Sequence, residues 1–177
     1  MTGIEPMPGE DKILVTSNDS RIRIYDLRDL SLTCKYKGYT NNSSQIRAGF
    51  SHDGKYITAG SENQCIFLWR THHEKQSAVN NLNNLTSRKD RNSFYEAIKA
   101  HNAAVTCSVF APNPNKIIEQ IQRNLNDQPE TLSALTEEEK SLNSGYVLVS
   151  GDYDGDIKVF YLLQKPKHSS LPPSAVS

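Results

Sequence analysis

The sequence lacks the features that several classes of protein require. Its three cysteines, Cys34, Cys65 and Cys107, are an odd number, stand far apart and form no Cys-x-x-Cys pair. This pattern argues against both a disulfide framework and a structural zinc site. Each cysteine falls in a run that is expected to form a strand, where a free thiol behaves as a small buried hydrophobe. A reducing compartment is therefore expected.

Long apolar runs, an excess of one charge and glycine-rich loops are missing as well. No apolar run approaches the roughly 20 residues of a membrane-spanning helix, and residues 1–12 carry acids in place of a signal-peptide core. The 20 basic and 20 acidic residues cancel, so no strong field steers the chain to nucleic acid or an anionic membrane. Glycine is only 9 of 177 residues and forms no phosphate-binding loop. We expect no nucleic acid, cofactor or metal ligand.

What the sequence does contain is an internal repeat. Three segments align without gaps: SNDSRIRIYD (17–26), SENQCIFLWR (61–70) and DYDGDIKVFY (152–161). Each is a polar turn followed by a β-rich run that ends in an aromatic residue. The aromatic residues are Tyr25, Trp69 and Phe160, and the turn residues six positions earlier are Asp19, Asn63 and Asp154. An apolar run precedes each turn, so each segment predicts a β-hairpin with Asp or Asn at the turn.

Further runs extend each hairpin into a larger unit. First strands are predicted at 2–5, 46–50 and 105–110, and fourth strands at 32–36 and 94–98. No fourth strand is predicted after Tyr161. The unit is thus four short antiparallel strands, and the first two hairpins are offset by 44 residues. That offset lies within the roughly 40–45 residues of a propeller repeat.

Two insertions separate the second and third units. Residues 71–93 are Asn-rich and predict a polar loop. Within 113–144, Ile117, Ile118, Ile121 and Leu125 lie near one helical face and predict a short helix. Thr136, followed three residues later by Glu139, resembles the capping box of a second helix. The Pro- and Ser-rich residues 164–177 predict a disordered tail.

At these residues the chain resembles the WD-repeat family. The family pattern has Gly-His before the first strand, Asp in the turn between the second and third strands, and Trp-Asp at the end of the third. The partial matches are Asp19 and Tyr25-Asp26, then Gly38-Tyr39, Asn63 and Trp69-Arg70, then Ala100-His101, Asp154 and Phe160. The resemblance implies an all-β fold of about three four-stranded antiparallel propeller blades, at about 1–37, 46–99 and 104–162. Together they form an incomplete propeller over 1–163, with a short helical insertion.

A closer resemblance concerns one branch of this family. The run ILVTSNDSRIRIYDLRDLSLTCKYKGY (13–39), with RDRN (90–93), IKAHNAAVT (98–106) and FAPNP (110–114), is similar to the C-terminal blades of WD-repeat proteins associated with Rab GTPases and endosomal recycling. The resemblance implies a cytoplasmic scaffold for vesicle trafficking, peripheral to endosomal or Golgi membranes. It also implies a Rab-family GTPase as a partner. In that branch the GTPase-binding segment lies upstream of the propeller, and nothing in this sequence corresponds to it.

The resemblance also implies a structural network in each blade, in which a His, a strand Ser and a turn Asp bond one another and end on the Trp. Its expected members are Asp19, Asn63, Trp69, His101, Ser150 and Asp154. Phe160 stands at the Trp position of the third unit and cannot donate a hydrogen bond, so that network should stop one member short. The alternative is a hydrolase that uses His101, Ser150 and Asp154 as a triad. Triads are recognised by geometry, and no Gly-x-Ser-x-Gly elbow is present, so we expect no enzyme.

In propellers, partners bind the loops around one mouth of the central channel. The candidates there are Arg21, Tyr39, Arg47, Glu62, His101 and Tyr153. A closed propeller needs about 4–8 blades, and the repeat supplies three. Four interpretations stay open: a piece of a longer propeller, a structural piece that completes another chain's propeller, self-association through open blade edges, and an open stack that its insertions cap.

Overall fold

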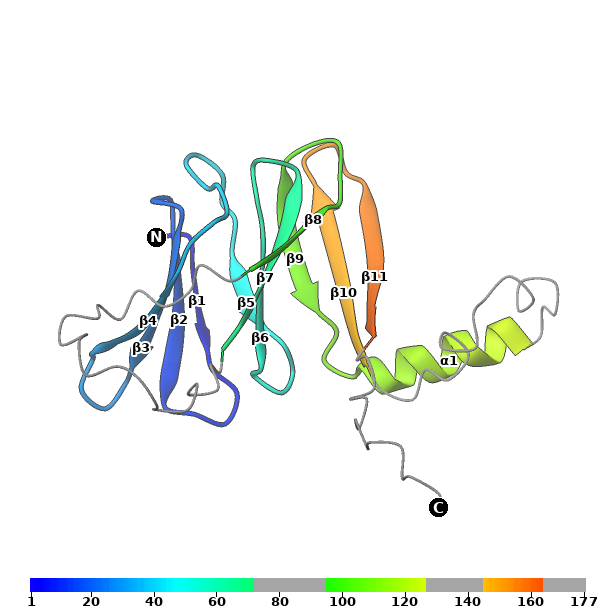
Figure 1. The fold of residues 1–177 in the computed structure, drawn as a ribbon, viewed down its shortest axis with the longest axis horizontal. Helices are drawn as coiled ribbons and strands as arrows, with labels where there is room; N and C mark the ends of the chain where they lie inside the picture. The colour runs from blue at the N-terminus through cyan, green and yellow to red at the C-terminus, as the bar shows by residue number, and fades with distance from the viewer. Residues whose placement is uncertain (72–94, 127–144, 164–177) are drawn as a thin grey trace, which may run out of the picture.

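The computed structural model describes residues 1–71, 95–126 and 145–163, and within them three antiparallel sheets stand side by side in chain order (Figure 1). Sheet A contains β1 (Gly3–Pro6), β2 (Lys12–Ser17), β3 (Arg21–Asp26) and β4 (Leu32–Tyr36). Sheet B contains β5 (Ala48–Phe50), β6 (Tyr56–Gly60), β7 (Cys65–Arg70) and β8 (Glu96–Lys99). Sheet C contains β9 (Val105–Phe110), β10 (Gly145–Asp152) and β11 (Ile157–Leu163). The predicted fold class, an incomplete all-β propeller with one short helix, is confirmed.

The three hairpins predicted from the repeat share one turn geometry. The residue after each expected turn residue has a positive φ: 56° at Ser20, 71° at Gln64 and 94° at Gly155. A left-handed residue at the same place in each turn lets the second and third strands pair without splaying. The gapless alignment of the three segments is therefore also an alignment of backbone conformation.

Apolar cores fill the two junctions between neighbouring sheets. Between sheets A and B, the indole of Trp69 meets the rings of Tyr36, Tyr39 and Phe67 at centroid distances of 6.2, 5.8 and 5.8 Å. Between sheets B and C, the core consists of Ile66, Leu68, Ala100, Val105 and Leu148. Apolar burial of this kind is the main term that stabilises stacked repeats, since each repeat buries its core only against a neighbour.

The two junctions are also crossed by hydrogen bonds from side chains. At the first, the Thr16 hydroxyl accepts from the N–H of Ala48 at 3.1 Å. At the second, the hydroxyls of Thr58 and Ser108 lie 2.6 Å apart, and the Tyr146 hydroxyl donates to Asp53 at 2.8 Å. These bonds give hydrogen-bond partners to polar groups that would otherwise be buried without one.

The predicted insertion helix is present as α1 (Pro114–Asn126), which starts at one end of sheet C and projects away from it (Figure 1). Its first turn is held by Ile117 and Ile118, which pack against Ala111 and Val147. The helix predicted after Thr136 and the tail lie outside the described residues, as does all but residue 71 of the predicted loop at 71–93.

Sheet C differs from the other two sheets in its number of strands. It has three strands in the order β11-β10-β9, and no fourth strand pairs with β11 within the described part of the chain. The residues that follow β11, for which no fourth strand is predicted, lie outside the described part of the chain. The first strand of sheet B is shorter than the predicted 46–50, since pairing begins only at Ala48.

Candidate protein-interaction face

The candidate surface residues gather at one end of the sheets. We call this end the turn face and define it by the β2–β3, β6–β7 and β10–β11 turns (17–21, 61–65 and 152–156) with the loops at 37–47 and 100–104. Backbone bonds interlock its parts: the N–H of Glu62 donates to Thr40 at 2.9 Å, and the N–H of Tyr153 donates to Ala104 at 2.9 Å. The face is therefore a single ordered surface and not a set of independent loops.

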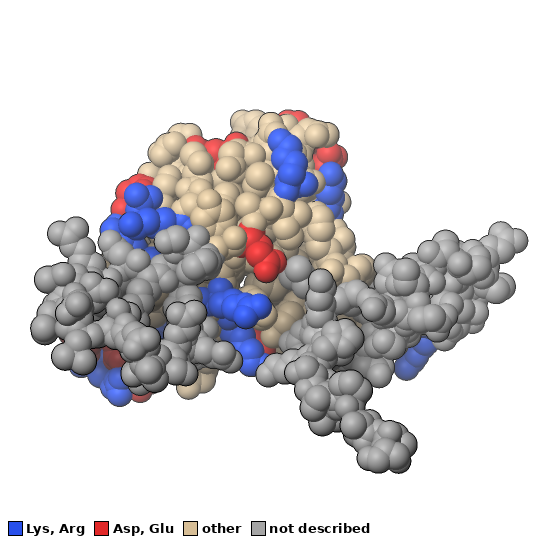
Figure 2. All heavy atoms as spheres, in the orientation of Figure 1, with Lys and Arg blue, Asp and Glu red and all other residues tan. Residues whose placement is uncertain are grey.

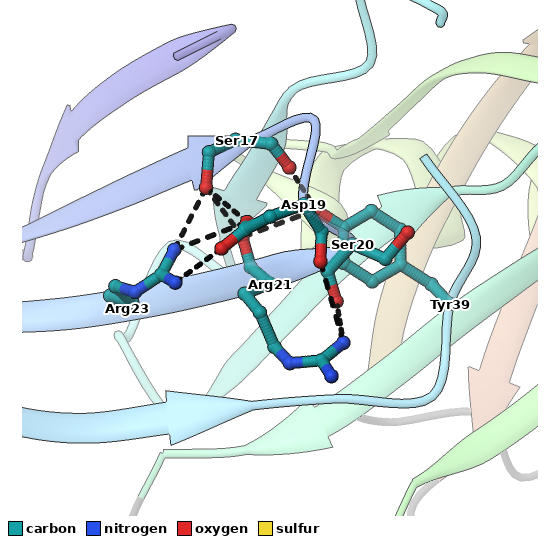
Figure 3. A network of polar contacts seen from close by, with 6 residues as sticks. All are labelled: Ser17, Asp19, Ser20, Arg21, Arg23 and Tyr39. Atoms are coloured by element: carbon teal, nitrogen blue, oxygen red, sulfur yellow. Dashed lines mark hydrogen bonds and ion pairs between the residues drawn. The ribbon is translucent and has the colours of Figure 1, made fainter. Parts of the chain in front are cut away.

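The first turn of the turn face carries a dense polar network (Figure 3). The guanidinium of Arg23 forms an ion pair with Asp19 and donates to the Ser17 hydroxyl at 2.8 Å. The Arg23 contact holds the pKa of Asp19 down at about 2. Arg21 donates to the carbonyl of Ser20 at 2.7 Å and so braces the same turn. The side chains of Arg21 and Arg23 are thus held in one position by contacts within the turn itself.

The loop at 40–44 is held by a carboxylate from the next turn. One carboxylate oxygen of Glu62 accepts from the backbone N–H groups of Asn42, Ser43 and Ser44, at 3.0, 2.8 and 2.9 Å. Charge-assisted bonds to three converging donors are strong for an exposed loop. These bonds, above all the one from Ser43, lower the pKa of Glu62 to about 2. Glu62 therefore acts as an internal ligand that orders this loop.

The other candidates have different degrees of exposure. Tyr39 is only 2% exposed, and its hydroxyl lies 3.4 Å from the carbonyls of Ser17 and Arg21 (Figure 3), so little of its side chain is open to a partner. Arg47 is exposed and its aliphatic stem covers Gly3. Tyr153 is 81% exposed on an ordered turn and is the most accessible aromatic side chain of the face.

The expected His–Ser pair lies behind the turn face. The Nε2 atom of His101 is 2.7 Å from the Ser150 hydroxyl, and Nδ1 is 3.1 Å from a carboxylate oxygen of Asp152. The carboxylate is therefore not that of Asp154, as expected, but that of Asp152, two residues earlier. Asp154 is exposed and contributes its backbone N–H, which donates to Asp152 at 3.1 Å. The gapless repeat hid this role, because serine stands at the matching position of the first two turns.

Burial decides what the His101–Ser150–Asp152 network can do. His101 is 2% exposed and Ser150 is 1% exposed, so neither side chain is open to a substrate. Burial raises the pKa of Asp152, but hydrogen bonds from the Asp156 N–H and from His101, with the charge of His101, outweigh it and lower the pKa overall. The network links strand β10, the turn after it and the loop before β9. Its geometry suits a structural brace.

The second sheet does not repeat this network. Trp69 is buried at 1% exposure, and its indole N–H donates to the carbonyl of Lys37 at 3.0 Å, across the junction with sheet A. Asn63 is exposed, and its backbone carbonyl accepts a weak bond from the thiol of Cys65 at 3.5 Å. The six expected network residues thus belong to three different repeat units, and among them His101 and Ser150 share a hydrogen bond.

The described residues lack the features that a metal site or a membrane-spanning segment would need. No group of three or more His, Cys, Asp or Glu side chains there is arranged to hold a metal ion. No helix among them has the length and apolar content to cross a membrane. Basic and acidic side chains are dispersed over the face seen in Figure 2, around a broad uncharged area. None of these observations singles out a nucleic-acid or lipid surface.

We expect acid to destabilise the loop that Glu62 holds. The pKa of Glu62 is lowered from 4.5 to about 2 in the folded chain, so its contribution is present above pH 4.5 and is lost as the pH falls toward 2. Glu62→Gln should therefore lose less unfolding free energy than the native chain between pH 7 and pH 3, measured by urea denaturation. Glu119→Gln on α1, where the carboxylate is 63% exposed, should behave like the native chain. Equal losses in all three chains would contradict this account of Glu62.

Comparisons with known proteins agree with the fold. The WD domain, G-beta repeat family matches residues 31–70, from the start of β4 to the end of β7. WD repeat-containing protein 44 of Xenopus laevis is 50% identical over 174 residues, which is 96% of this chain. Autophagic-related protein 16.2 of Caenorhabditis elegans is 31% identical over 70 residues, which is 38% of this chain and 13% of that protein.

The chain spans only 18% of the length of the Xenopus protein that it matches. The likeness to that protein nevertheless runs along nearly the whole chain, at half of its positions. The family match covers the last strand of sheet A and the first three strands of sheet B, and sheets A and C share the turn geometry of sheet B. The chain therefore belongs to the WD-repeat family.

Proposed function

We propose that the chain is a non-catalytic protein-interaction scaffold that binds a protein partner through its turn face. The observation that carries the proposal is Tyr153, whose side chain is 81% exposed on a turn whose backbone is hydrogen-bonded to the neighbouring loop. Tyrosine is enriched among the residues that dominate binding energy at protein interfaces. A rigid aromatic side chain also loses little conformational entropy when it is buried by a partner.

The rest of the turn face suits the same role. Arg21 and Arg23 are braced by Asp19 and by backbone carbonyls, and Glu62 holds the 40–44 loop in one conformation. Preorganised side chains reduce the entropy cost of association. The non-catalytic part of the proposal is supported by the burial of His101 and Ser150, the two side chains that a hydrolase would have to expose.

We propose further that this scaffold serves vesicle trafficking, with a Rab-family GTPase as the first partner to test. The support is the resemblance of residues 13–39, 98–106 and 110–114 to the trafficking-associated branch of the family, together with the half-identical WD repeat-containing protein 44. Because that branch carries its GTPase-binding segment upstream of the propeller, contact through the blades themselves would be an additional mode of binding.

The test is direct binding of the chain to purified Rab-family GTPases, each loaded with GDP or with a non-hydrolysable GTP analogue, measured by fluorescence anisotropy. We expect Tyr153→Ala to weaken binding by at least about tenfold, as hot-spot aromatics do. Leu30→Ala, in the β3–β4 turn and 73% exposed, should leave binding unchanged. If no GTPase binds, the trafficking proposal fails. If Tyr153→Ala binds like the native chain, the turn face is not the site.

A further inference from the structure

The loop at 40–44 has its backbone donors bonded by side chains of the two neighbouring turns. The N–H of Asn41 donates to the Ser20 hydroxyl at 2.9 Å, and the next three N–H groups all donate to Oε1 of Glu62. Consecutive N–H groups that converge on one point form a concavity that binds anions. We call the three N–H groups of residues 42–44, together with the Ser43 hydroxyl, the amide cradle.

The amide cradle is held from both sheet A and sheet B. The Ser20 hydroxyl, in the β2–β3 turn of sheet A, bonds the residue before the cradle, and Asn18 of the same turn donates to the carbonyl of its last residue at 2.8 Å. Glu62 comes from the β6–β7 turn of sheet B. Asn42 and Ser43 are exposed, so the cradle lies at the surface. Its form therefore depends on neither end of the row of sheets.

The donors of the amide cradle outnumber the acceptor sites that Glu62 presents to them. Its Oε1 atom receives the N–H groups of residues 42–44 at 3.0, 2.8 and 2.9 Å and also the Ser43 hydroxyl at 3.2 Å. A carboxylate oxygen has about two lone-pair sites, and the second oxygen of Glu62 accepts no hydrogen bond from the described residues. A phosphate monoester carries three acceptor oxygens and a charge of about −1.5 to −2, so it can divide the same donors among more acceptors.

A positive charge beside the amide cradle also suits a phosphate. The Arg21 guanidinium donates to the Ser20 carbonyl at 2.7 Å (Figure 3), and the Ser20 hydroxyl lies 3.3 Å from the side-chain oxygen of Asn42. Both hydrogen bonds of that guanidinium go to carbonyl oxygens, so no carboxylate in the described part of the chain pairs with Arg21. A cation without an ion pair attracts a dianion more strongly than the single charge of a carboxylate.

We propose that the amide cradle binds the phosphate monoester of a phosphorylated protein partner, and that this phosphate takes the place of the Glu62 carboxylate. In the free chain Glu62 keeps the cradle formed and occupied. In the complex its side chain turns to solvent, and the same N–H groups donate to the phosphate. The inference rests on the proposal that the turn face binds a protein, and it names the chemistry that this face recognises.

NMR spectroscopy of the full chain, titrated with inorganic phosphate at constant ionic strength, tests the site. The amide resonances of residues 42–44 should shift, and the carboxyl carbon resonance of Glu62 should shift with them as the carboxylate leaves the cradle. Glu62→Gln removes the charged competitor and should bind phosphate at least about tenfold tighter than the native chain, since charge-assisted hydrogen bonds are roughly twice as strong as neutral ones. In that variant, a second change, Ser43→Ala, removes one donor and should weaken binding by about threefold. Glu119→Gln, on α1 and 63% exposed, is the matched control and should bind like the native chain.

A peptide library decides whether a protein carries the phosphate. From phosphoserine peptides with randomised flanking residues, the native chain should retain a defined subset that binds at least about tenfold tighter than inorganic phosphate, because flanking residues add hydrogen bonds. The same library without phosphate should not be retained. Amide resonances that stay fixed, a Glu62→Gln chain that binds phosphate no tighter than the native chain, acetate that binds as tightly as phosphate, or a library retained without preference would each overturn the proposal. No GTPase enters these measurements, so they can fail while the GTPase test succeeds, and the reverse.

Discussion

Replacing Trp69 with alanine is expected to lower the free energy of unfolding by about 3–5 kcal/mol, the usual cost of removing a buried large aromatic side chain. Trp69 is 1% exposed and contacts the rings of Tyr36, Tyr39 and Phe67, so its loss opens a cavity where sheets A and B meet. It also removes the 3.0 Å hydrogen bond to Lys37. Each sheet buries its core only against a neighbour, so the damage should loosen both sheets together.

The measurement is urea denaturation followed by circular dichroism, with Tyr153→Ala as the control. Tyr153 is an aromatic residue of the same repeat architecture, but it is 81% exposed, so its removal should change the free energy by less than about 0.5 kcal/mol. A loss for Trp69→Ala below about 1 kcal/mol, well under the usual range for such a residue, would show that sheets A and B do not share one core.

The sequence predicted the hairpins well because their signals are local. Polar turns with Asp or Asn, flanked by β-rich runs, occur three times in one register, and the structure places Ser20, Gln64 and Gly155 in the same left-handed conformation. The short helix was also predicted, since Ile117, Ile118, Ile121 and Leu125 recur near one helical face. The first two of them pack against sheet C. Features that depend on near neighbours in the chain were thus accessible from the sequence.

The features that the sequence missed depend on packing between distant segments. Tyr39 stands in a loop where exposure was expected, yet its ring is buried against Trp69 of the next sheet, 30 residues away in the chain. Asp152 was overlooked because its counterparts are serines and because Asp154 fits the turn pattern better. Only the placement of His101, which comes from a loop 51 residues before it, shows that Asp152 is the partner. Neither the Tyr39–Trp69 contact nor the His101–Asp152 contact can be predicted from a periodic pattern in the sequence.

Substitutions in the buried network around His101 can distinguish a structural role from a hydrolase. We expect His101→Ala to lower the free energy of unfolding by about 2–4 kcal/mol. Two buried polar groups would lose a partner, and an unsatisfied buried group costs about 1–3 kcal/mol. The groups are the Ser150 hydroxyl at 2.7 Å and the Asp152 carboxylate at 3.1 Å. Ser150→Ala removes one hydroxyl only and should cost less, about 1–2 kcal/mol.

Asp154→Ala is the control that tests the position of the carboxylate. Asp154 is exposed and contacts Asp152 only through its backbone N–H, so its side chain should matter by less than about 0.5 kcal/mol. The hydrolysis of p-nitrophenyl acetate, measured on the same proteins, should stay at the rate of buffer in all of them, because no substrate reaches a serine that is 1% exposed. Ester hydrolysis by the native chain that disappears in Ser150→Ala would instead establish a catalytic serine. Loss of stability without any such activity would support the brace as the role of the network.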